Sequence, residues 1–290
     1  MALFPTETVY GLACDAGNPR AVAEVYEAKG RPRFNPLIAH VADLAMAQRL
    51  ARLDDRALAL AQAFWPGPLT LVAPIRDEGA VCDLARAGLD TLAVRVPGHL
   101  LARALLEAFG GPVVAPSANR SGRPSPTTFA DAMEETGFAC AAALDGGDCA
   151  VGLESTVIAV LDGPPRLLRP GGVTRAAIEA VIGPLAEAQA DAKRSPGRLA
   201  LHYAPNAPVR LGADAARPGE ILLGFGDIAG DPAFNLSPAG DLAEAASHLF
   251  AYLRAADRLR PTAIAVATIP EEGLGEAIND RLLRATGKIG

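Results

Sequence analysis

Short apolar runs alternate with longer amphipathic stretches along most of the chain. Short apolar runs bounded by Gly, Pro or polar residues are typical of buried β-strands. Such runs lie at 37–41, 69–72, 91–97, 112–115, 156–158, 166–169, 220–223 and 263–266. Stretches with helical spacing of apolar residues lie at 19–29, 43–64, 98–109, 128–136, 174–182, 240–256 and 275–285. This alternation of strands and helices predicts an α/β fold.

The apolar run at 3–12 differs from the others because polar side chains lie inside it. Thr6, Glu7 and Thr8 are enclosed by apolar residues, and Gly11 closes the run. We interpret it as a buried strand that ends in a polar turn. Burying hydroxyls and a carboxylate is costly unless they find partners. Those partners are either the backbone of a capped strand end or a bound ligand, and this run alone does not distinguish the two.

A change of composition at 184–198 divides the chain. These residues are rich in Ala and polar side chains and lack a buried pattern, which indicates a linker. After the linker, the pattern of strands and helices restarts. We therefore predict a large first domain at 1–183, a linker at 184–205 and a small Rossmann-like α/β domain at 206–290. Near its end the linker carries Tyr203, in a segment that is either inert or folds back over a site as a lid.

Composition narrows the classes of protein that fit. The net charge is −6 and no long basic block occurs, which argues against nonspecific nucleic-acid binding by the whole surface. No apolar run approaches the length of a membrane span and no export leader is present, so we expect a cytoplasmic protein. The four cysteines and four histidines are scattered. This pattern argues against a disulfide framework and against a metal held by protein side chains.

The loop at 29–36 concentrates positive charge. Lys29, Arg31 and Arg33 lie between buried elements in a Gly/Pro-rich segment that cannot be helical. Such a run is usually a solvated face, but fixed cations also suit a triphosphate. Lysine occurs only three times among the 27 cationic residues, which fits Lys29 as a compact point charge.

Two arginines interrupt predicted strands. Alternation along 91–97 places Thr91, Ala93 and Arg95 on one face and the branched residues on the other. An arginine inside a β-branched strand needs an anion. That anion is either an internal carboxylate or a ligand carboxylate or phosphate, and the pattern leaves both open. Arg169, at the end of the run 166–169, needs an anion for the same reason.

Eight motifs occur in order along the first two thirds of the chain: PTETVYGL, KGRPRFNPL, WPGPLTL, AVRVP, APSANRSG, ESTV, LRPG and SPGRLALHYAP. Together they resemble the YrdC-like threonylcarbamoyl-AMP synthases, in the longer form that carries a C-terminal domain. The motifs span residues 4–205, and the C-terminal domain fits the long form with less specificity. A helix and the start of a strand usually precede the first motif in this family, whereas Pro5 is already the fifth residue here.

The resemblance implies a fold and a reaction. The fold would be a twisted, open mixed sheet with a concave, positively lined cavity. The reaction would convert L-threonine, bicarbonate and ATP into threonylcarbamoyl-AMP and diphosphate, the first step of t6A synthesis at position 37 of tRNA. Mg²⁺ would accompany ATP. A downstream tRNA threonylcarbamoyl transferase complex would take the product, a weak contact with tRNA is compatible, and no membrane is involved.

The resemblance also implies roles for individual residues. L-threonine would be held by Thr8, His40, Arg95, Ser155 and the backbone of Ala115. ATP would be held by Lys29, Arg31, Asn35, Thr91, Ser117, Asn119, Ser125, Arg169 and Tyr203. Lys29 and Arg31 would serve catalysis through charge, whereas Glu7 and Glu154 would orient cations or loops.

Two other classes of function share features with this sequence. A module that binds double-stranded RNA or tRNA without catalysis could use a concave basic sheet, but the net acidity and the lack of basic runs argue against it. A carbamoyltransferase of the hydrogenase-maturation type carries a related domain, but its companion zinc-finger cysteines are missing here.

Overall fold

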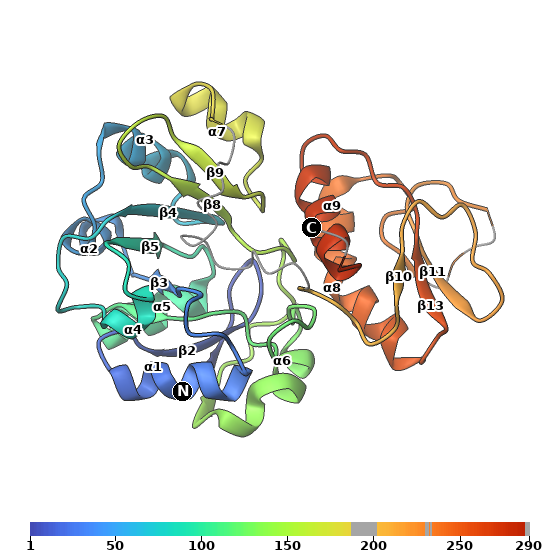
Figure 1. The fold of residues 1–290 in the computed structure, drawn as a ribbon, viewed down its shortest axis with the longest axis horizontal. Coiled ribbons are helices and arrows are strands. Elements are labelled where there is room, and N and C mark those ends of the chain that lie inside the picture. The colour runs from blue at the N-terminus through green and yellow to red at the C-terminus, as the bar shows by residue number, and fades with distance from the viewer. Residues whose placement is uncertain (187–201, 230–231, 233, 288–290) are drawn as a thin grey trace.

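The chain forms two β-sheets, each covered by helices (Figure 1). The computed structural model describes residues 1–186, 202–229, 232 and 234–287. Residues 187–201, most of the predicted linker, lie outside the described residues. Both sheets combine with helices in the predicted α/β manner, and a large mixed sheet precedes a small parallel one.

The large sheet has nine strands within the described residues, in the order β7-β1-β2-β6-β3-β5-β4-β8-β9. The strands are β1 Ala2–Phe4, β2 Gly11–Asp15, β3 Ile38–His40, β4 Leu69–Pro74, β5 Thr91–Arg95, β6 Val113–Val114, β7 Ala142–Ala143, β8 Thr156–Ala159 and β9 Arg166–Arg169. The pairs β1–β7, β3–β5 and β4–β8 are parallel and the others are antiparallel. The sheet is therefore mixed, as expected.

Helices cover both faces of the large sheet. They are α1 Pro19–Lys29, α2 Leu44–Leu50, α3 Asp55–Phe64, α4 Asp83–Arg86, α5 Leu100–Phe109, α6 Phe129–Thr136 and α7 Arg175–Ile182, with a short 3-10 turn at Gly137–Ala139. The expected single helix at 43–64 is wrong, because two helices occupy that stretch. Ala51 is extended and bridges to Ile75, and the side chain of Asp54 accepts the backbone N–H of Ala57 to start α3.

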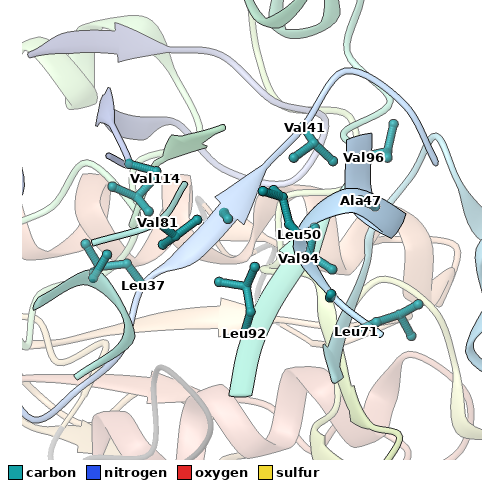
Figure 2. Packing of buried hydrophobic residues seen from close by; sticks show 14 of the residues in the cluster. Leu37, Val41, Ala47, Leu50, Leu71, Val81, Leu92, Val94, Val96 and Val114 are labelled. Atoms are coloured by element: carbon teal, nitrogen blue, oxygen red, sulfur yellow. The ribbon is translucent and has the colours of Figure 1, made fainter. Parts of the chain in front are cut away.

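The main apolar core lies between one face of the large sheet and the helices α1 to α4. Figure 2 shows part of it, with Leu92, Val94 and Val96 packed near Leu50 and Leu71. Helix α5 packs against the opposite face through a separate apolar cluster. The predicted alternation along β5 is thus confirmed, because its branched residues enter the core and Arg95 faces the other side.

The polar run near the N-terminus differs from its expected form. Strand β1 ends at Phe4, residues 5–10 form an irregular turn, and Gly11 begins β2 instead of closing a strand. The hydroxyl of Thr6 donates to the carbonyl of Val9 across 2.6 Å and accepts the N–H groups of Thr8 and Val9. Strand β1 lies between β2 and β7, so it is not an edge of the sheet.

The second sheet belongs to the small C-terminal domain. Its strands are all parallel, in the order β10-β13-β11-β12: β10 Val209–Arg210, β11 Glu220–Gly224, β12 Phe234–Asn235 and β13 Ala263–Val266. Helices α8 Leu242–Arg258 and α9 Gly275–Ala285 lie between this sheet and the large domain (Figure 1). Within the described ranges, none of the helices combines the length and apolar character that a bilayer span requires.

Candidate active site

A small cavity of about 50 Å³ lies on the face of the large sheet that is opposite the main apolar core. Nine of the fourteen predicted site residues line it: Thr8, Arg31, His40, Arg95, Ala115, Ser117, Ser155, Arg169 and Tyr203. The rest of the lining comprises Val9, Pro36, Leu37, Ile38, Pro116, Glu154 and His202. Residues from six separate motifs and the linker therefore meet in one hollow.

Three predicted residues lie directly behind the lining. The ammonium of Lys29 donates to the carbonyl oxygens of Ser117 and Asn119, and the carbonyl of Asn35 accepts from Nε of Arg31 across 3.3 Å. Ser125 donates to Oε1 of Glu154 across 2.5 Å. These residues support groups of the cavity wall, and they are not part of the lining themselves.

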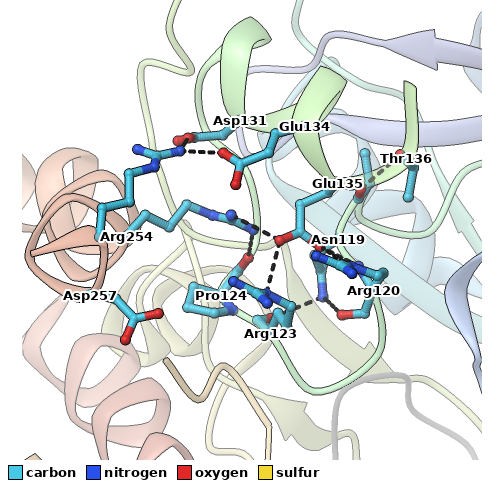
Figure 3. A network of polar contacts seen from close by, with 12 residues as sticks. Asn119, Arg120, Arg123, Pro124, Asp131, Glu134, Glu135, Thr136, Arg254 and Asp257 are labelled. Carbon is cyan, nitrogen blue, oxygen red and sulfur yellow. Dashed lines mark hydrogen bonds and ion pairs between the residues drawn. The ribbon is translucent and has the colours of Figure 1, made fainter. Parts of the chain in front are cut away.

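Asn119 and Thr91 lie farther from the cavity. The amide of Asn119 donates to the carbonyls of Arg120 and Arg123, within the polar network of Figure 3. Thr91 begins β5, whereas Arg95 ends it, which separates them by about 13 Å at roughly 3.3 Å per residue. The proposed ATP contacts of Asn119 and Thr91 stay predictions from the family resemblance.

Arg95 is held in the wall by three hydrogen bonds. Its Nε donates to the carbonyl of Gly67 across 3.1 Å, and Nη1 donates to the hydroxyl of Thr8 across 2.9 Å. Nη2 donates to Oε1 of Glu7 across 2.6 Å. The anion that the strand pattern requires is therefore present inside the chain. A guanidinium carries five N–H groups, so these three bonds leave two for a ligand.

Glu7 is ionised by its surroundings. Burial by itself would raise the pKa of this carboxyl, but the charge and hydrogen bond of Arg95 and the N–H of Gly98 together lower its pKa below the ordinary value. The ion pair orients the guanidinium toward the cavity, which is the orienting role expected for Glu7.

His40 lies beside Arg95 because the two are register partners on the parallel strands β3 and β5. Burial, and next the positive charge of Arg95, lower the pKa of His40 to about 3, so the ring is neutral at pH 7. Its Nδ1 is buried without a hydrogen-bond partner among the described residues. A neutral imidazole in this place can exchange a hydrogen bond with a ligand.

The segment at 154–156 and the end of β9 form the opposite wall. Arg169 donates to the carbonyl of Ser155 across 2.9 Å and to its hydroxyl across 3.2 Å, and that hydroxyl also bonds Thr70 across 2.7 Å. Gly171 makes this approach feasible, because a Cβ there would lie 2.3 Å from the carbonyl oxygen of Glu154.

The cations of the wall are destabilised by burial. Burial lowers the pKa of Arg31 to about 10, and it lowers the pKa of Lys29 well below its ordinary value, with Arg31 as the next cause. Neither side chain has a carboxylate within 4.0 Å among the described residues. A bound anion would relieve that cost, which makes this end of the cavity suited to phosphate.

Glu154, His202 and Arg281 contribute to this site in ways that the sequence patterns did not show. Glu154 was expected only to orient neighbours, yet it lines the cavity, and His202 lines it beside Tyr203 with their rings 4.0 Å apart. Adjacency to Tyr203 in the last motif was a signal for His202. Arg281 reaches Glu154 from the C-terminal domain, and no local pattern indicated this contact.

Comparison with known proteins identifies the family. The Sua5/YciO/YrdC family model, described as "Telomere recombination", matches residues 1–171. The model described as "Threonylcarbamoyl-AMP synthase, C-terminal domain" matches residues 173–287. The chain belongs to the threonylcarbamoyl-AMP synthase family, in its two-domain form. It is accordingly an enzyme of the nucleotidyltransferase class, as the resemblance implied.

Relatives match over nearly the full chain. The threonylcarbamoyl-AMP synthase of Bacillus subtilis is 38% identical over 307 residues, covering 98% of this chain and 88% of the relative. That of Pyrococcus abyssi is 40% identical over 311 residues, covering 99% and 90%. The crystal structure of P. abyssi Sua5 complexed with L-threonine superposes with a TM-score of 0.90 at 38% identity, covering 99% of this chain and 90% of that one.

Proposed function

We propose that this enzyme converts L-threonine, bicarbonate and ATP into threonylcarbamoyl-AMP and diphosphate. The observation that carries the proposal is the convergence of Arg95, Arg31 and Arg169 on one cavity from three separate segments. The names of the relatives and the threonine complex of the P. abyssi protein support it.

The threonine end of the cavity would be the wall around Arg95. A carboxylate there would accept the two remaining N–H groups of the guanidinium, which Glu7 and Thr8 already orient. The side chains of His40 and Ser155, with the backbone of Ala115, would complete the contacts with the amino acid. This preformed geometry would lower the entropy lost on binding.

The nucleotide end would be the wall formed by Arg31, Ser117 and Arg169, with Lys29 behind it. Lys29 is buried and Arg31 is partly buried, and neither has a nearby carboxylate among the described residues, so a polyphosphate would supply the missing negative charge. Charge neutralisation at this end would favour departure of diphosphate.

The reaction needs no protein nucleophile. The threonine amine takes up CO₂ from bicarbonate to form a carbamate, whose oxygen attacks the α-phosphorus as the bond to diphosphate breaks. The protein would hold the carbamate and the phosphate in line and stabilise the charge that develops on the phosphoryl oxygens. Arg31 and Lys29 would serve catalysis in this way.

Mg²⁺ would enter as part of the ATP substrate. The cavity lining contains one carboxylate, Glu154, and its two oxygens are already bonded by Ser125 and Arg281. Among the described residues no group of three or more His, Cys, Asp or Glu side chains forms a metal site. The side chains of this cavity therefore fit an ion that the ATP phosphates carry.

The cavity must enlarge before ATP binds. A volume of about 50 Å³ is well below the roughly 300 to 1,000 Å³ of pockets that bury drug-sized ligands. His202 and Tyr203 close one side of it, and Tyr203 is 1% exposed. We therefore assign to this end of the linker the lid role that the resemblance implied: it opens for ATP and closes over the nucleotide.

The product would be used in the cytoplasm for t6A synthesis at position 37 of tRNA. A mixed anhydride of a carbamate and AMP hydrolyses readily, so a downstream threonylcarbamoyl transferase complex would need to receive it quickly. Contact with tRNA would be weak, given the net charge of −6.

The test is diphosphate release by the purified chain with ATP and Mg²⁺. We expect release only when both threonine and bicarbonate are present. With ¹³C-bicarbonate, mass spectrometry should show an adenylate that carries the label and one threonine. Release that needs neither threonine nor bicarbonate would overturn the proposal.

A further inference from the structure

Arg281 lies on α9 of the C-terminal domain, but its side chain ends at the cavity of the large domain. Among the residues that the structure describes it is the largest fully buried side chain, with 0% exposed. Its Nε donates to Oε2 of Glu154 across 2.9 Å, although the two residues are 127 positions apart. The C-terminal domain thus reaches the wall of the active site through one guanidinium.

The other bonds of Arg281 fix the same wall. Nη1 donates to the carbonyl of Pro170 across 2.8 Å and to Oδ2 of Asp280 across 2.9 Å. Pro170 directly follows Arg169, and Glu154 directly precedes Ser155. Arg169 and Ser155 contact each other and form one side of the cavity. Arg281 therefore holds the residue next to Arg169 and the residue next to Ser155.

Arg281 also contacts Tyr203, another residue of the cavity lining. Its Cζ lies 5.4 Å from the centroid of the Tyr203 ring, a distance at which a cation and an aromatic face attract. Both oxygens of Glu154 are occupied, one by Arg281 and one by Ser125. The carboxylate is consequently fixed in direction, with Tyr203 and Arg169 in the same lining.

We propose that Arg281 is a positioning residue of the active site, which keeps Glu154 ionised and fixed as a structural anion between Arg169 and the Tyr203 segment. The C-terminal domain thereby supplies one charge that the catalytic domain lacks. This inference rests on the proposed function for its activity readout, but its charge readout does not.

A role as a simple link between domains does not account for this placement. Arg254 of α8 bonds Glu135 of α6 across 3.1 Å, and Arg175 bonds Glu276 across 2.6 Å. These pairs, the first of which lies in the network of Figure 3, already join the two domains away from the cavity. The Arg254–Glu135 pair is buried as well, so what distinguishes Arg281 is its place, because its partner Glu154 lines the cavity.

The ionisation of Glu154 depends on side chains from several helices and strands. Burial by itself would raise the pKa of this carboxyl, but Arg281, and next Arg169, lower the pKa below its ordinary value together with the Ser125 hydroxyl. Among the described residues, the titratable and charged groups around it are Arg281 and Asp280 of α9, Arg169 of β9, Lys29 of α1, and His202 and Tyr203 before β10. Without Arg281, the groups among the described residues that still lower this pKa against burial are Arg169, Lys29 and the Ser125 hydroxyl.

The experiment compares R281M, E154Q and R281M/E154Q with the wild type. Wild-type kcat/KM should show no protonation of Glu154 above pH 6. R281M should gain an acidic limb, losing about tenfold for each pH unit below the raised pKa. The double variant should lack that limb, because it has no carboxyl to protonate. R175A is the matched control: it breaks a pair between the same two domains and should keep the wild-type profile.

A second readout measures the carboxyl directly. In protein labelled with ¹³C at glutamate side-chain carboxyls, the resonance that E154Q lacks should titrate at higher pH in R281M than in the wild type. An unchanged titration, or a loss of activity in R281M that is equal at every pH, would overturn the proposal. An inactive wild type with the titration shift present would reject the proposed function alone. If R281M fails to fold, R281K replaces it in the experiment. The lysine should keep Glu154 ionised, so kcat/KM should be as independent of pH in the acid range as in the wild type. An acidic limb in R281K would contradict the proposal.

Discussion

Arg95 on β5 and Glu7 in the turn before β2 form an ion pair of 2.6 Å at the wall of the cavity. Arg95 is 3% exposed and its partner carboxylate is 15% exposed. The strand pattern left open whether the anion that Arg95 needs is an internal carboxylate or a ligand. The ion pair shows that the carboxylate of Glu7 is an internal anion for Arg95. It also aims the guanidinium at the cavity, with two of its five N–H groups outside these hydrogen bonds.

Arg95 and Arg169 are expected to serve different ligands. Arg95→Ala should weaken threonine binding more than ATP binding, and Arg169→Ala should do the reverse. A lost charge-assisted bond is worth about 1.5 to 3 kcal/mol, which corresponds to roughly 10- to 150-fold in affinity. Isothermal titration calorimetry with each substrate measures both constants. Equal losses for the two ligands in either variant would contradict the assignment.

Nucleotide binding is expected to take up protons through Lys29. In the free enzyme, burial and the charge of Arg31 lower the pKa of Lys29 well below its ordinary value. A polyphosphate nearby favours the charged form and raises that pKa, so at a pH between the two values the complex binds more protons than the free enzyme. Calorimetry in buffers of different ionisation enthalpy measures the uptake, which should lie between zero and one proton.

Lys29→Met is the control for this proton uptake. It removes the titrating amine, so heats of nucleotide binding should become independent of the buffer. Uptake of the same size in Lys29→Met and in the wild type would show that another group titrates.

Tyr203 is expected to contribute to turnover through its ring. It packs 5.3 Å from the ring of Phe250 and lines the cavity. Tyr203→Phe keeps this ring and should retain most of the turnover. Tyr203→Ala removes the wall and should lower kcat at least tenfold. Because the ring is buried, the alanine variant should also lose about 3 to 5 kcal/mol of stability.

Threonine binding separates the two effects in the Tyr203 variants. Since the hydrogen bonds that hold Arg95 go to Gly67, Thr8 and Glu7 and not to Tyr203, Tyr203→Ala should still bind threonine at a temperature where it is folded. Full loss of threonine binding together with a collapse of the melting temperature would instead indicate a purely structural residue.

Glu135 is expected to hold the two domains together. It is 1% exposed and accepts from the backbone of Arg120 and from the side chains of Arg123 and Arg254 (Figure 3). Glu135→Gln leaves Arg254 buried without its anion, which should cost about 3 to 5 kcal/mol of unfolding free energy. Chemical denaturation measures it. Arg20→Ala breaks a pair at an exposed side chain and should change stability by less than about 1 kcal/mol.

The lowered pKa of Glu135 predicts that the free energy of unfolding depends on pH in the acid range. Burial by itself would raise the pKa of Glu135, but the N–H of Arg120 and the charges of Arg254 and Arg123 lower it below 4.5. A lowered carboxyl pKa stabilises the fold fully above 4.5 and loses that contribution as pH falls through the folded value. The wild type should therefore lose stability faster than Glu135→Gln below about pH 4.5. Parallel curves for the two proteins would contradict this role.

The sequence by itself determined the fold class, most elements and nine of the residues that line the cavity. Alternation along 91–97 was enough to place Arg95 opposite the core, because side-chain direction in a strand follows from period alone. The ordered motifs were enough to indicate the family. Helix boundaries were weaker, since the break at Ala51 depends on a bridge to Ile75 that no local pattern encodes.

Tertiary structure alone decided which groups pair. Glu7 becomes the anion of Arg95 only because the turn at 5–10 folds against the end of β5, and Arg281 meets Glu154 only because α9 docks on the large domain. The period of a strand or helix indicates which face a side chain occupies. Which residue it pairs with on that face depends on how segments far apart in the sequence pack against each other. That is why the sequence indicated the residues of the cavity, and only the folded chain showed that a second domain contributes to its charge.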